Sequence, residues 1–282
     1  MPGSLKHEDT TRLALIANAR MYSSTPRAAA AWRALFEIVA DRADVALTKI
    51  DHPFPAPLEA LWERDDLGAA FMCGWPYARN FTRHRLVAAP VPSPPRYEGR
   101  PIYFTDFVVR ADSSIRSLND VLGLRFAYTV ETSHSGWNAP RHHLLKFRTP
   151  ERTRLFAETL GPFVTPLRAL AAVIDGTTDA APIDSYVIDL VRAHDPATAA
   201  TIRVIETTEA APVPPLVASP AIDPAIAARI GDAFVALADD RAAAPHMAAL
   251  LLKGFARPSA GEYRITLERA AAAEAAGYAR IV

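Results

Sequence analysis

The feature that most constrains the fold is the segment 67–73, which is apolar at almost every position. A strand with one solvated face alternates apolar and polar residues, so this uninterrupted run indicates a strand covered on both faces of its sheet. Strand-like and helix-like segments alternate along the chain, as in α/β folds. We therefore expect a mainly parallel sheet with helices on both faces, built from strands at 12–18, 45–50, 67–73, 102–109, 124–130, 178–183 and 201–205.

Several of these strands end in turns rich in polar and aromatic residues. In open α/β sheets, ligands bind outside the carboxyl ends of the strands. The turns at 20–25, 73–77, 131–136 and 183–186 all stand at such ends. The sequence thus predicts that the functional residues come from these four turns.

The turn at 131–136 is dense in hydroxyl groups and small residues, and a helix is expected to follow it over 140–147. Ser135 can cap this helix, and Gly136 allows a ligand to approach the backbone closely. The first amides of a helix lack intrahelical partners and carry partial positive charge, so they form a ready anion site. Two interpretations stay open: Ser133 and Ser135 only cap the helix, or they also bind a ligand.

Composition excludes several other classes of protein. The 282 residues carry no net formal charge, so nothing in the charge balance suggests a nucleic-acid or membrane-surface partner. Cys73 is the only cysteine, which rules out an internal disulfide. No apolar run approaches the ~18 residues that a membrane-spanning helix needs.

The N-terminus carries a short apolar run at 13–17 followed by Ala17-Asn18-Ala19. A secretory signal needs an apolar region of ~7–15 residues after a basic leader. The run is too short, and Glu8 and Asp9 precede it. We interpret it as part of the first buried strand, so that a complete chain of this sequence is expected to be cytoplasmic.

The residues do not fit the common catalytic or cofactor patterns. His142 and His143 are neighbours on one expected helix and point in different directions, and His134 lies outside that helix, so no metal-ligand spacing is present. The segment Thr132-Ser-His-Ser-Gly136 lacks the first glycine of a nucleophile elbow. With no phosphate loop and no dinucleotide fingerprint, we expect neither a metal nor a cofactor.

Several segments occur in an order and spacing that resemble the phosphonate-binding family of ABC-transporter substrate-binding proteins. The resemblance extends over roughly residues 12–280. The segments that carry it are the turn at Tyr22, 71–75, 107–114, 117–126, Ser133-His-Ser-Gly136 with Pro140, 174–181, 202–205 and 212–217.

The resemblance implies a two-lobed type II periplasmic-binding-protein fold with two crossover hinge strands. Applied to this chain, lobe one would comprise residues 1–103 together with 212–282, and lobe two residues 104–211. The crossovers would lie near 102–108 and 205–215.

The resemblance also implies a set of ligand-binding residues. The family's Ser-Thr-Ser-Gly turn, which holds phosphonate oxygens, matches Ser133, Ser135 and Gly136, with His134 in place of the threonine. Tyr22 matches an aromatic residue of the first loop, and Trp75 or Tyr77 matches one of the second loop. Asp184 matches a polar position that holds the substrate amine in phosphonate binders.

Each of these matches has a structural alternative. Tyr22 and Trp75 could be core aromatics, and Asp184 could simply cap the helix that follows it. Arg141 is either a surface residue or a bidentate clamp for an oxyanion.

Taken together, the sequence predicts a monomeric solute-binding protein that closes two lobes around a small anion, such as a phosphonate or a phosphate ester, for ABC-type uptake. Its partners would be the membrane subunits of the transporter, and the resemblance implies a periplasmic location. One alternative is a cytoplasmic enzyme on the same fold, of the menaquinone-pathway or thiamine-pyrimidine-synthase type. Another is a cytoplasmic ligand sensor.

Overall fold

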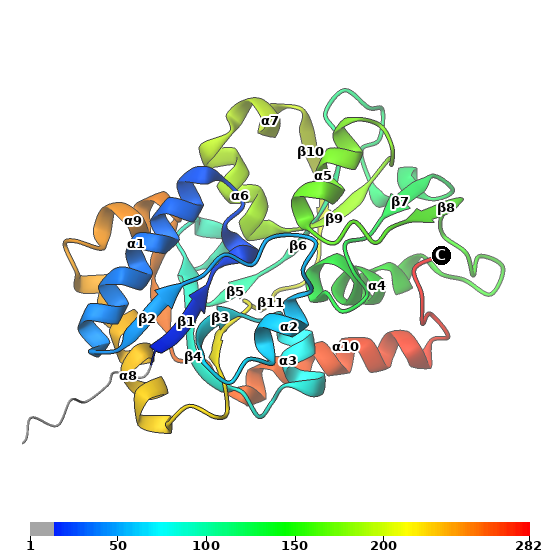
Figure 1. The fold of residues 1–282 in the computed structure, drawn as a ribbon. Helices are drawn as coiled ribbons and strands as arrows, with labels where there is room; N and C mark the ends of the chain where they lie inside the picture. The colour runs from blue at the N-terminus through cyan, green and yellow to red at the C-terminus, as the bar shows by residue number, and fades with distance from the viewer. Residues whose placement is uncertain (1–13) are drawn as a thin grey trace, which may run out of the picture.

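Two β-sheets, each with its own helices, make up the computed structural model, which describes residues 14–282 (Figure 1). The first sheet has six strands in the order β13-β4-β12-β3-β1-β2. Their bounds are β1 Ala14–Asn18, β2 Ala46–Lys49, β3 Leu67–Phe71, β4 Arg85–Pro92, β12 Leu216–Ala218 and β13 Leu252–Ala256. Residues 12 and 13 of the expected first strand lie outside the described part.

The second sheet has three strands in the order β10-β6-β9, and a separate pair, β7-β8, lies beside it. An isolated bridge between Phe126 and Ala180 links this pair to the sheet. The bounds are β6 Thr105–Arg110, β7 Arg125–Ala127, β8 Glu158–Leu160, β9 Ala181–Asp184 and β10 Ile202–Thr207.

Helices surround both sheets. In the first lobe, α1, α8 and α9 pack together against the first sheet. The α-helices are α1 Pro26–Ala43, α2 Leu58–Trp62, α3 Gly74–Asn80, α4 Ala139–His143, α5 Pro166–Ile174, α6 Ser185–His194, α7 Pro196–Ala200, α8 Pro224–Val235, α9 Ala244–Ala249 and α10 Arg264–Ala275. The short turns are η1 Arg20–Tyr22, η2 Pro95–Tyr97, η3 Leu118–Val121, η4 His134–Asn138, η5 Leu144–Phe147, η6 Ala236–Asp239 and η7 Ala260–Tyr263. No helix of the described residues is long and apolar enough to cross a membrane.

The chain passes between the lobes through two short strands that pair with each other. These are β5 (Ile102–Tyr103) and β11 (Ala211–Pro212), which run antiparallel. β5 leads into β6 of the second sheet, and β11 leads back to β12 of the first. The two-lobed fold with two crossover strands is therefore confirmed. The exact lobe boundaries stay a prediction.

The sheets are mixed, and the expectation of mainly parallel sheets is wrong. β1 pairs in parallel with β2 and β3, and β7 pairs in parallel with β8. The other paired strands among the described residues run antiparallel. The crossovers explain much of this difference. A strand that arrives from the other lobe enters the sheet at the edge where the sheet's own strands end, so it runs antiparallel to them. Thr105 at the start of β6, for example, lies opposite Asp184 at the end of β9.

The segment 245–253 is only partly helical. α9 ends at Ala249, and β13 follows as the edge strand of the first sheet, antiparallel to β4. The strand includes the buried residues Leu252 and Phe255, which join the main core cluster. Pairing with β4 therefore decides the conformation of this segment, because a short apolar run is compatible with either a helix or a strand.

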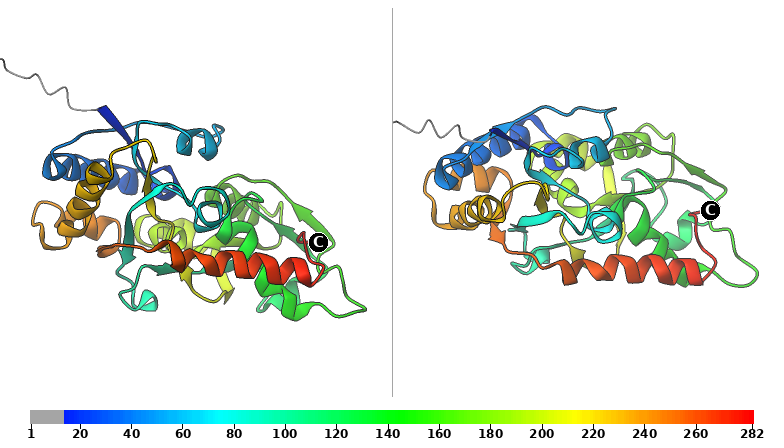
Figure 2. Two further views of the ribbon diagram at one scale, coloured as in Figure 1. Left: turned by 90° about the horizontal axis from the view of Figure 1, so that it is seen from below. Right: turned by 60° about the horizontal axis from the view of Figure 1, so that its bottom comes forward.

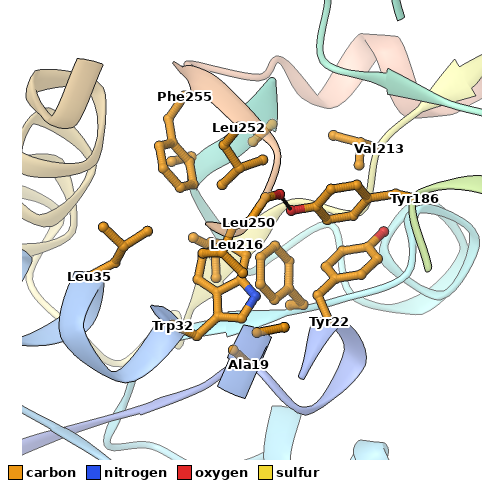
Figure 3. Close-up of a cluster of buried hydrophobic side chains, with 14 of the residues drawn as sticks. Ala19, Tyr22, Trp32, Leu35, Tyr186, Val213, Leu216, Leu250, Leu252 and Phe255 are labelled. Atoms are coloured by element: carbon orange, nitrogen blue, oxygen red, sulfur yellow. Dashed lines mark hydrogen bonds between the residues drawn. The ribbon is translucent and has the colours of Figure 1, made fainter. Parts of the chain in front are cut away.

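The largest core cluster extends from the first sheet into the second lobe. Figure 3 shows its centre, where Tyr22 and Trp32 of the first lobe lie near Tyr186 of α6. The Tyr186 hydroxyl donates to the carbonyl of Leu250. This shared core brings the two lobes into close contact in the present conformation.

The end of the chain packs on the second lobe. α10 runs along one edge of the molecule, and the residues after it reach the vicinity of β8 (Figures 1 and 2). Tyr278 and Ile281 belong to the core cluster of Phe107 and Phe126 in the second lobe. The Leu155 amide donates to the Val282 oxygen at 2.6 Å. The C-terminal segment thus joins the lobes a third time, in addition to the two crossover strands.

This packing predicts that Tyr278→Ala destabilises the protein substantially. The ring is buried in the second core, and truncating a buried aromatic residue costs about 3 kcal/mol or more of unfolding free energy. Urea unfolding measures the loss. Val282→Ala is the matched control: this side chain is 40% exposed, so we expect a change of about 0.5 kcal/mol or less. Equal stabilities of the two variants would contradict the packing.

Candidate functional site

The four turns expected to carry the function meet where the lobes touch. The Tyr22 hydroxyl from the first lobe donates to Asp184 Oδ2 of the second at 3.2 Å. The backbone amide of His134 donates to Cys73 Sγ at 3.1 Å, which joins the turn after β3 to the turn at 131–136. The structure therefore brings Tyr22, Cys73, His134 and Asp184 into one buried interlobe region.

Ser133 caps the helical turn that follows it. Its Oγ accepts from the Gly136 amide at 2.9 Å, and the π-helical turn η4 begins at His134. The helix thus starts before the expected residue 140, and the cap is Ser133, not Ser135. Ser135 lies within the turn, is 7% exposed, and accepts at its carbonyl from Thr105 Oγ1 at 3.0 Å. The hydroxyl group of Ser133 thus has a structural role in this conformation.

Gly136 is required because the chain itself comes close. A Cβ built at Gly136 would lie 1.7 Å from Thr129 Oγ1 and 2.8 Å from Thr129 Cβ. Any side chain at 136 would therefore collide with the segment after β7. The close neighbour of Gly136 in the structure is Thr129, and the approach of a ligand to this backbone stays a prediction.

The imidazole of His134 is buried and neutral. Asn138 Nδ2 lies 3.1 Å from His134 Nδ1 and also donates to the Thr266 carbonyl at 2.8 Å. This pairing assigns Nδ1 as the acceptor and places the ring proton on Nε2. Burial, together with Arg269 and His142, lowers the pKa of His134 to about 3.

Arg269 of α10 lies on the other side of the same ring. Its Nη1 is 3.5 Å from His134 Nε2, so two N–H donors face each other there. The guanidinium also donates to the Ala210 carbonyl at 2.7 Å, and its side chain is 5% exposed. The position between His134 Nε2 and Arg269 Nη1 therefore favours a hydrogen-bond acceptor.

Asp184 is a buried carboxyl group with few cations near it. Its Oδ1 caps α6 by accepting from the Tyr186 and Val187 amides at 2.9 and 3.3 Å. Burial raises the pKa of Asp184 to about 7, against the hydrogen bonds from these amides and from Tyr22, which lower it. The expected capping role is therefore present, and the same carboxyl group reaches across the lobe boundary to Tyr22.

Trp75 lies in the helix α3, where the sequence suggested a turn, and is inserted into the core of the second lobe. Arg79 and Arg141 lie near its ring, 4.9 and 5.7 Å from the centroid. Arg141 is buried, not on the surface. Tyr77 instead packs edge-on against Tyr263 at 5.3 Å in a different cluster, away from the second core.

Several buried polar atoms around this region have no hydrogen-bond partner in the structure. Two of them, Trp75 Nε1 and Arg141 Nε, can only donate. The others near the four turns are the hydroxyl groups of Ser24 and Thr129. Unpaired buried donors cost free energy, so a group that supplied acceptors here would be favoured.

Sequence reasoning missed four residues of this region. Cys73 was noted only as the sole cysteine, and Tyr103 and Thr105 were noted only as parts of the crossover. Arg269 lies in the alanine-rich last helix, far in sequence from His134. Only Cys73 carried a usable signal, because it directly follows the apolar strand at whose end a ligand was expected.

The described residues contain no group of three or more His, Cys, Asp or Glu that could hold a metal ion. Two cavities lie outside the four turns. One, of about 330 Å³, is lined by residues that include His142, Lys146, Glu209 and Arg269. The other, of about 310 Å³, lies beside the C-terminal segment.

Comparisons with known proteins agree with this architecture. The profile of the family described as "ABC transporter, phosphonate, periplasmic substrate-binding protein" matches residues 22–263. No curated protein matches the sequence.

Among solved structures, a binding-protein component of an ABC phosphonate transporter from Pseudomonas aeruginosa is similar, with a TM-score of 0.79 and 16% identity over 94% of this chain and 88% of that one. PhnD1 from Prochlorococcus marinus, in complex with methylphosphonate, has a TM-score of 0.76 and 15% identity over 92% and 97% of the two chains. An alkanesulfonate-binding protein from Xanthomonas axonopodis pv. citri, bound to MOPS, has a TM-score of 0.56 and 17% identity over 95% and 94%. At these identities the likeness concerns the fold.

The site predicts an unusual dependence of stability on pH in the variant Asp184→Asn. A carboxyl group with a raised pKa stabilises the fold below its unfolded pKa, and this contribution is lost as the pH rises towards 7. The depressed pKa of His134 acts in the opposite direction, so its contribution is lost as the pH falls below 6.5 towards 3. The two effects partly cancel in the native protein.

Asp184→Asn removes one of the two opposing titrations and can still cap α6 through its side-chain oxygen. We expect the variant to gain stability relative to the native protein as the pH rises from 4 to 8, by on the order of 2–4 kcal/mol. Urea unfolding across this pH range measures it. Asp175→Asn, at an exposed position, serves as the control, and parallel pH profiles for all three proteins would contradict the assignment.

Proposed function

This chain belongs to the phosphonate-binding family of ABC-transporter periplasmic substrate-binding proteins, and on that premise we propose that it binds a small oxyanion between its two lobes. The ligand would be a phosphonate, a phosphate ester or a similar anion. Because the members of this family are substrate-binding proteins, the enzyme alternative loses its support.

The observation that carries the proposal is the set of buried hydrogen-bond donors without acceptors in and beside the four turns. Trp75 Nε1 and Arg141 Nε are buried donors with no partner, and His134 Nε2 faces Arg269 Nη1. An oxyanion supplies several strong acceptors at once and would relieve these donors. The fixed turn His134–Asn138 adds its capped backbone to the same region.

Two solved relatives in fold support the oxyanion class. PhnD1 from Prochlorococcus marinus is in complex with methylphosphonate, and the alkanesulfonate-binding protein is bound to MOPS, which carries a sulfonate. In this chain, His134 stands where the family's turn has threonine, so we propose that the headgroup contacts differ from those of phosphonate binders. Tyr22, Trp75, Ser133, Ser135, Gly136 and Asp184 complete the proposed ligand-binding set.

Hinge closure would couple binding to transport. Tyr22 and Trp75 come from the first lobe, and His134 and Asp184 from the second, so a ligand that contacts both lobes binds the closed state more tightly and shifts the population towards it. We propose that the protein acts as a monomer and delivers its ligand to the membrane subunits of a transporter, in the periplasm as the family description indicates.

The role of Asp184 can be tested with ligands that differ only in a positive group. We propose that this carboxylate binds the amine of an aminoalkylphosphonate, which would keep it ionised at neutral pH. Asp184→Asn is expected to weaken an aminoalkylphosphonate by on the order of tenfold or more and methylphosphonate by about threefold or less. Calorimetry measures both affinities, with Asp175→Asn as the control.

Native mass spectrometry of the purified protein first shows which small anion it carries. If the native protein binds no phosphonate, phosphate ester or sulfonate, the proposed function is wrong. If Asp184→Asn weakens both phosphonates equally, the amine contact is wrong while the anion site stands.

Cys73 provides a native reporter of closure. Its thiol is buried at the lobe junction and accepts from the His134 amide, and burial raises its pKa, so it should react slowly with a thiol reagent in the closed state. A saturating ligand is expected to slow labelling by about fivefold or more, because labelling requires opening. Cys73→Ser, which leaves no thiol in the chain, is the control. Labelling that is unaffected by any bound ligand would contradict closure around it.

A further inference from the structure

The second cavity lies outside the interlobe region and is lined by three arginines. Its walls include Arg148 and Arg154 from the loop after η5, and Tyr278 and Arg280 from the C-terminal segment. None of the side chains that line it is acidic. Its volume of about 310 Å³ is at the lower end of the range for small-molecule sites.

The surrounding sequence is strongly basic in a chain whose net charge is zero. Residues 141–154 contain five Lys or Arg and one Glu. Among the described residues, no ion pair involves Arg148, Arg154 or Arg280, whereas Arg141 and Lys146 do have acidic partners. No Asp or Glu side chain therefore neutralises the three cavity arginines. The one carboxyl group in the lining is that of Val282, and among the described residues it forms no ion pair with them.

Backbone carbonyl groups hold two of these guanidinium groups in place. Arg148 donates from Nη1 to the Ala276 carbonyl at 2.5 Å and lies over the Tyr278 ring, 4.7 Å from its centroid. Arg154 donates from Nε to the Phe156 carbonyl at 2.8 Å and from Nη2 to the Ala157 carbonyl at 2.6 Å. Such contacts orient the planar groups without cancelling their charge, so little side-chain freedom remains to be lost on binding an anion.

We propose that this cavity is a second anion site, separate from the interlobe site, which takes a phosphate-class dianion. A tetrahedral anion offers acceptors in several directions and can contact three guanidinium groups from two parts of the chain, whereas a carboxylate is satisfied by one bidentate arginine. Because Arg280 follows α10 and Arg148 and Arg154 belong to the second lobe, a bound dianion ties the C-terminal segment to that lobe.

The test is a titration with inorganic phosphate at constant ionic strength, followed by NMR of the arginine Nε–H signals. These signals report locally, so phosphate that enters the interlobe site does not imitate the result. We expect saturable shifts of the Arg148 and Arg154 signals. Arg280→Gln, which removes an exposed side chain, is expected to weaken the apparent affinity about tenfold.

Arg152→Gln is the matched control, because Arg152 belongs to the same loop and carries the same charge but does not line the cavity. We expect it to change the affinity by about twofold or less. Arg154→Lys keeps the charge and loses the planar fork, so it should weaken binding by about fivefold. The proposal is overturned if the shifts do not saturate, if Arg280→Gln binds like the native protein, or if Arg152→Gln weakens binding as much as Arg280→Gln.

Discussion

The contact between Tyr22 and Asp184 is the interaction on which the rest of the interlobe region depends. It joins the first loop of one lobe to the end of β9 in the other, and it is fully buried between aromatic rings. Its location follows from the topology of the fold. The strands that precede the four turns end at the boundary between the lobes, so the turns of the two lobes face one another. Any ligand between the lobes must contact these same turns, and opening the lobes must break this hydrogen bond.

Two titratable groups at that boundary are held towards their neutral forms, and charged groups lie beside them. Asp184 and His134 are both held towards their neutral forms by burial. Beside the crossover, Arg96 instead pairs with Asp106 and Asp189 at 2.9 and 3.0 Å. Burial lowers the pKa of Arg96, but Tyr97 and these carboxylates raise it more strongly, so the cation persists. A donor-rich region with the Arg269 guanidinium group beside His134 suits a ligand that brings a negative charge.

The C-terminal segment gives the fold an additional link between the lobes. Two paired crossover strands define the hinge, and α10 with the residues after it extends from the first lobe onto the core of the second. Arg269 of this helix faces His134, so the proposed interlobe site and the C-terminal helix share a wall. The basic cavity beside Arg280 lies at the far end of the same segment, where an anion would strengthen its attachment.

The sequence alone determined the fold class, most of the element order and the turns that meet at the site, because buried strands, helix caps and strand-end turns are local patterns. It identified Tyr22, His134 and Asp184 as members of one region although they lie far apart along the chain. It did not determine strand direction, since whether a strand runs with or against its neighbours depends on the edge at which it enters the sheet.

Only the tertiary structure decided which partner each polar group has. It assigned the Ser133 hydroxyl to the Gly136 amide, Cys73 to the His134 amide, and Arg269 to the far side of the imidazole. It also showed that residue 136 must be glycine because the Thr129 side chain packs directly against its backbone. The contacts of Cys73 and Arg269 with His134 join residues that are far apart in the sequence, and their energies depend on burial, which no local pattern in the sequence specifies. The Ser133 cap, by contrast, is a local contact that the sequence allowed as one of two interpretations.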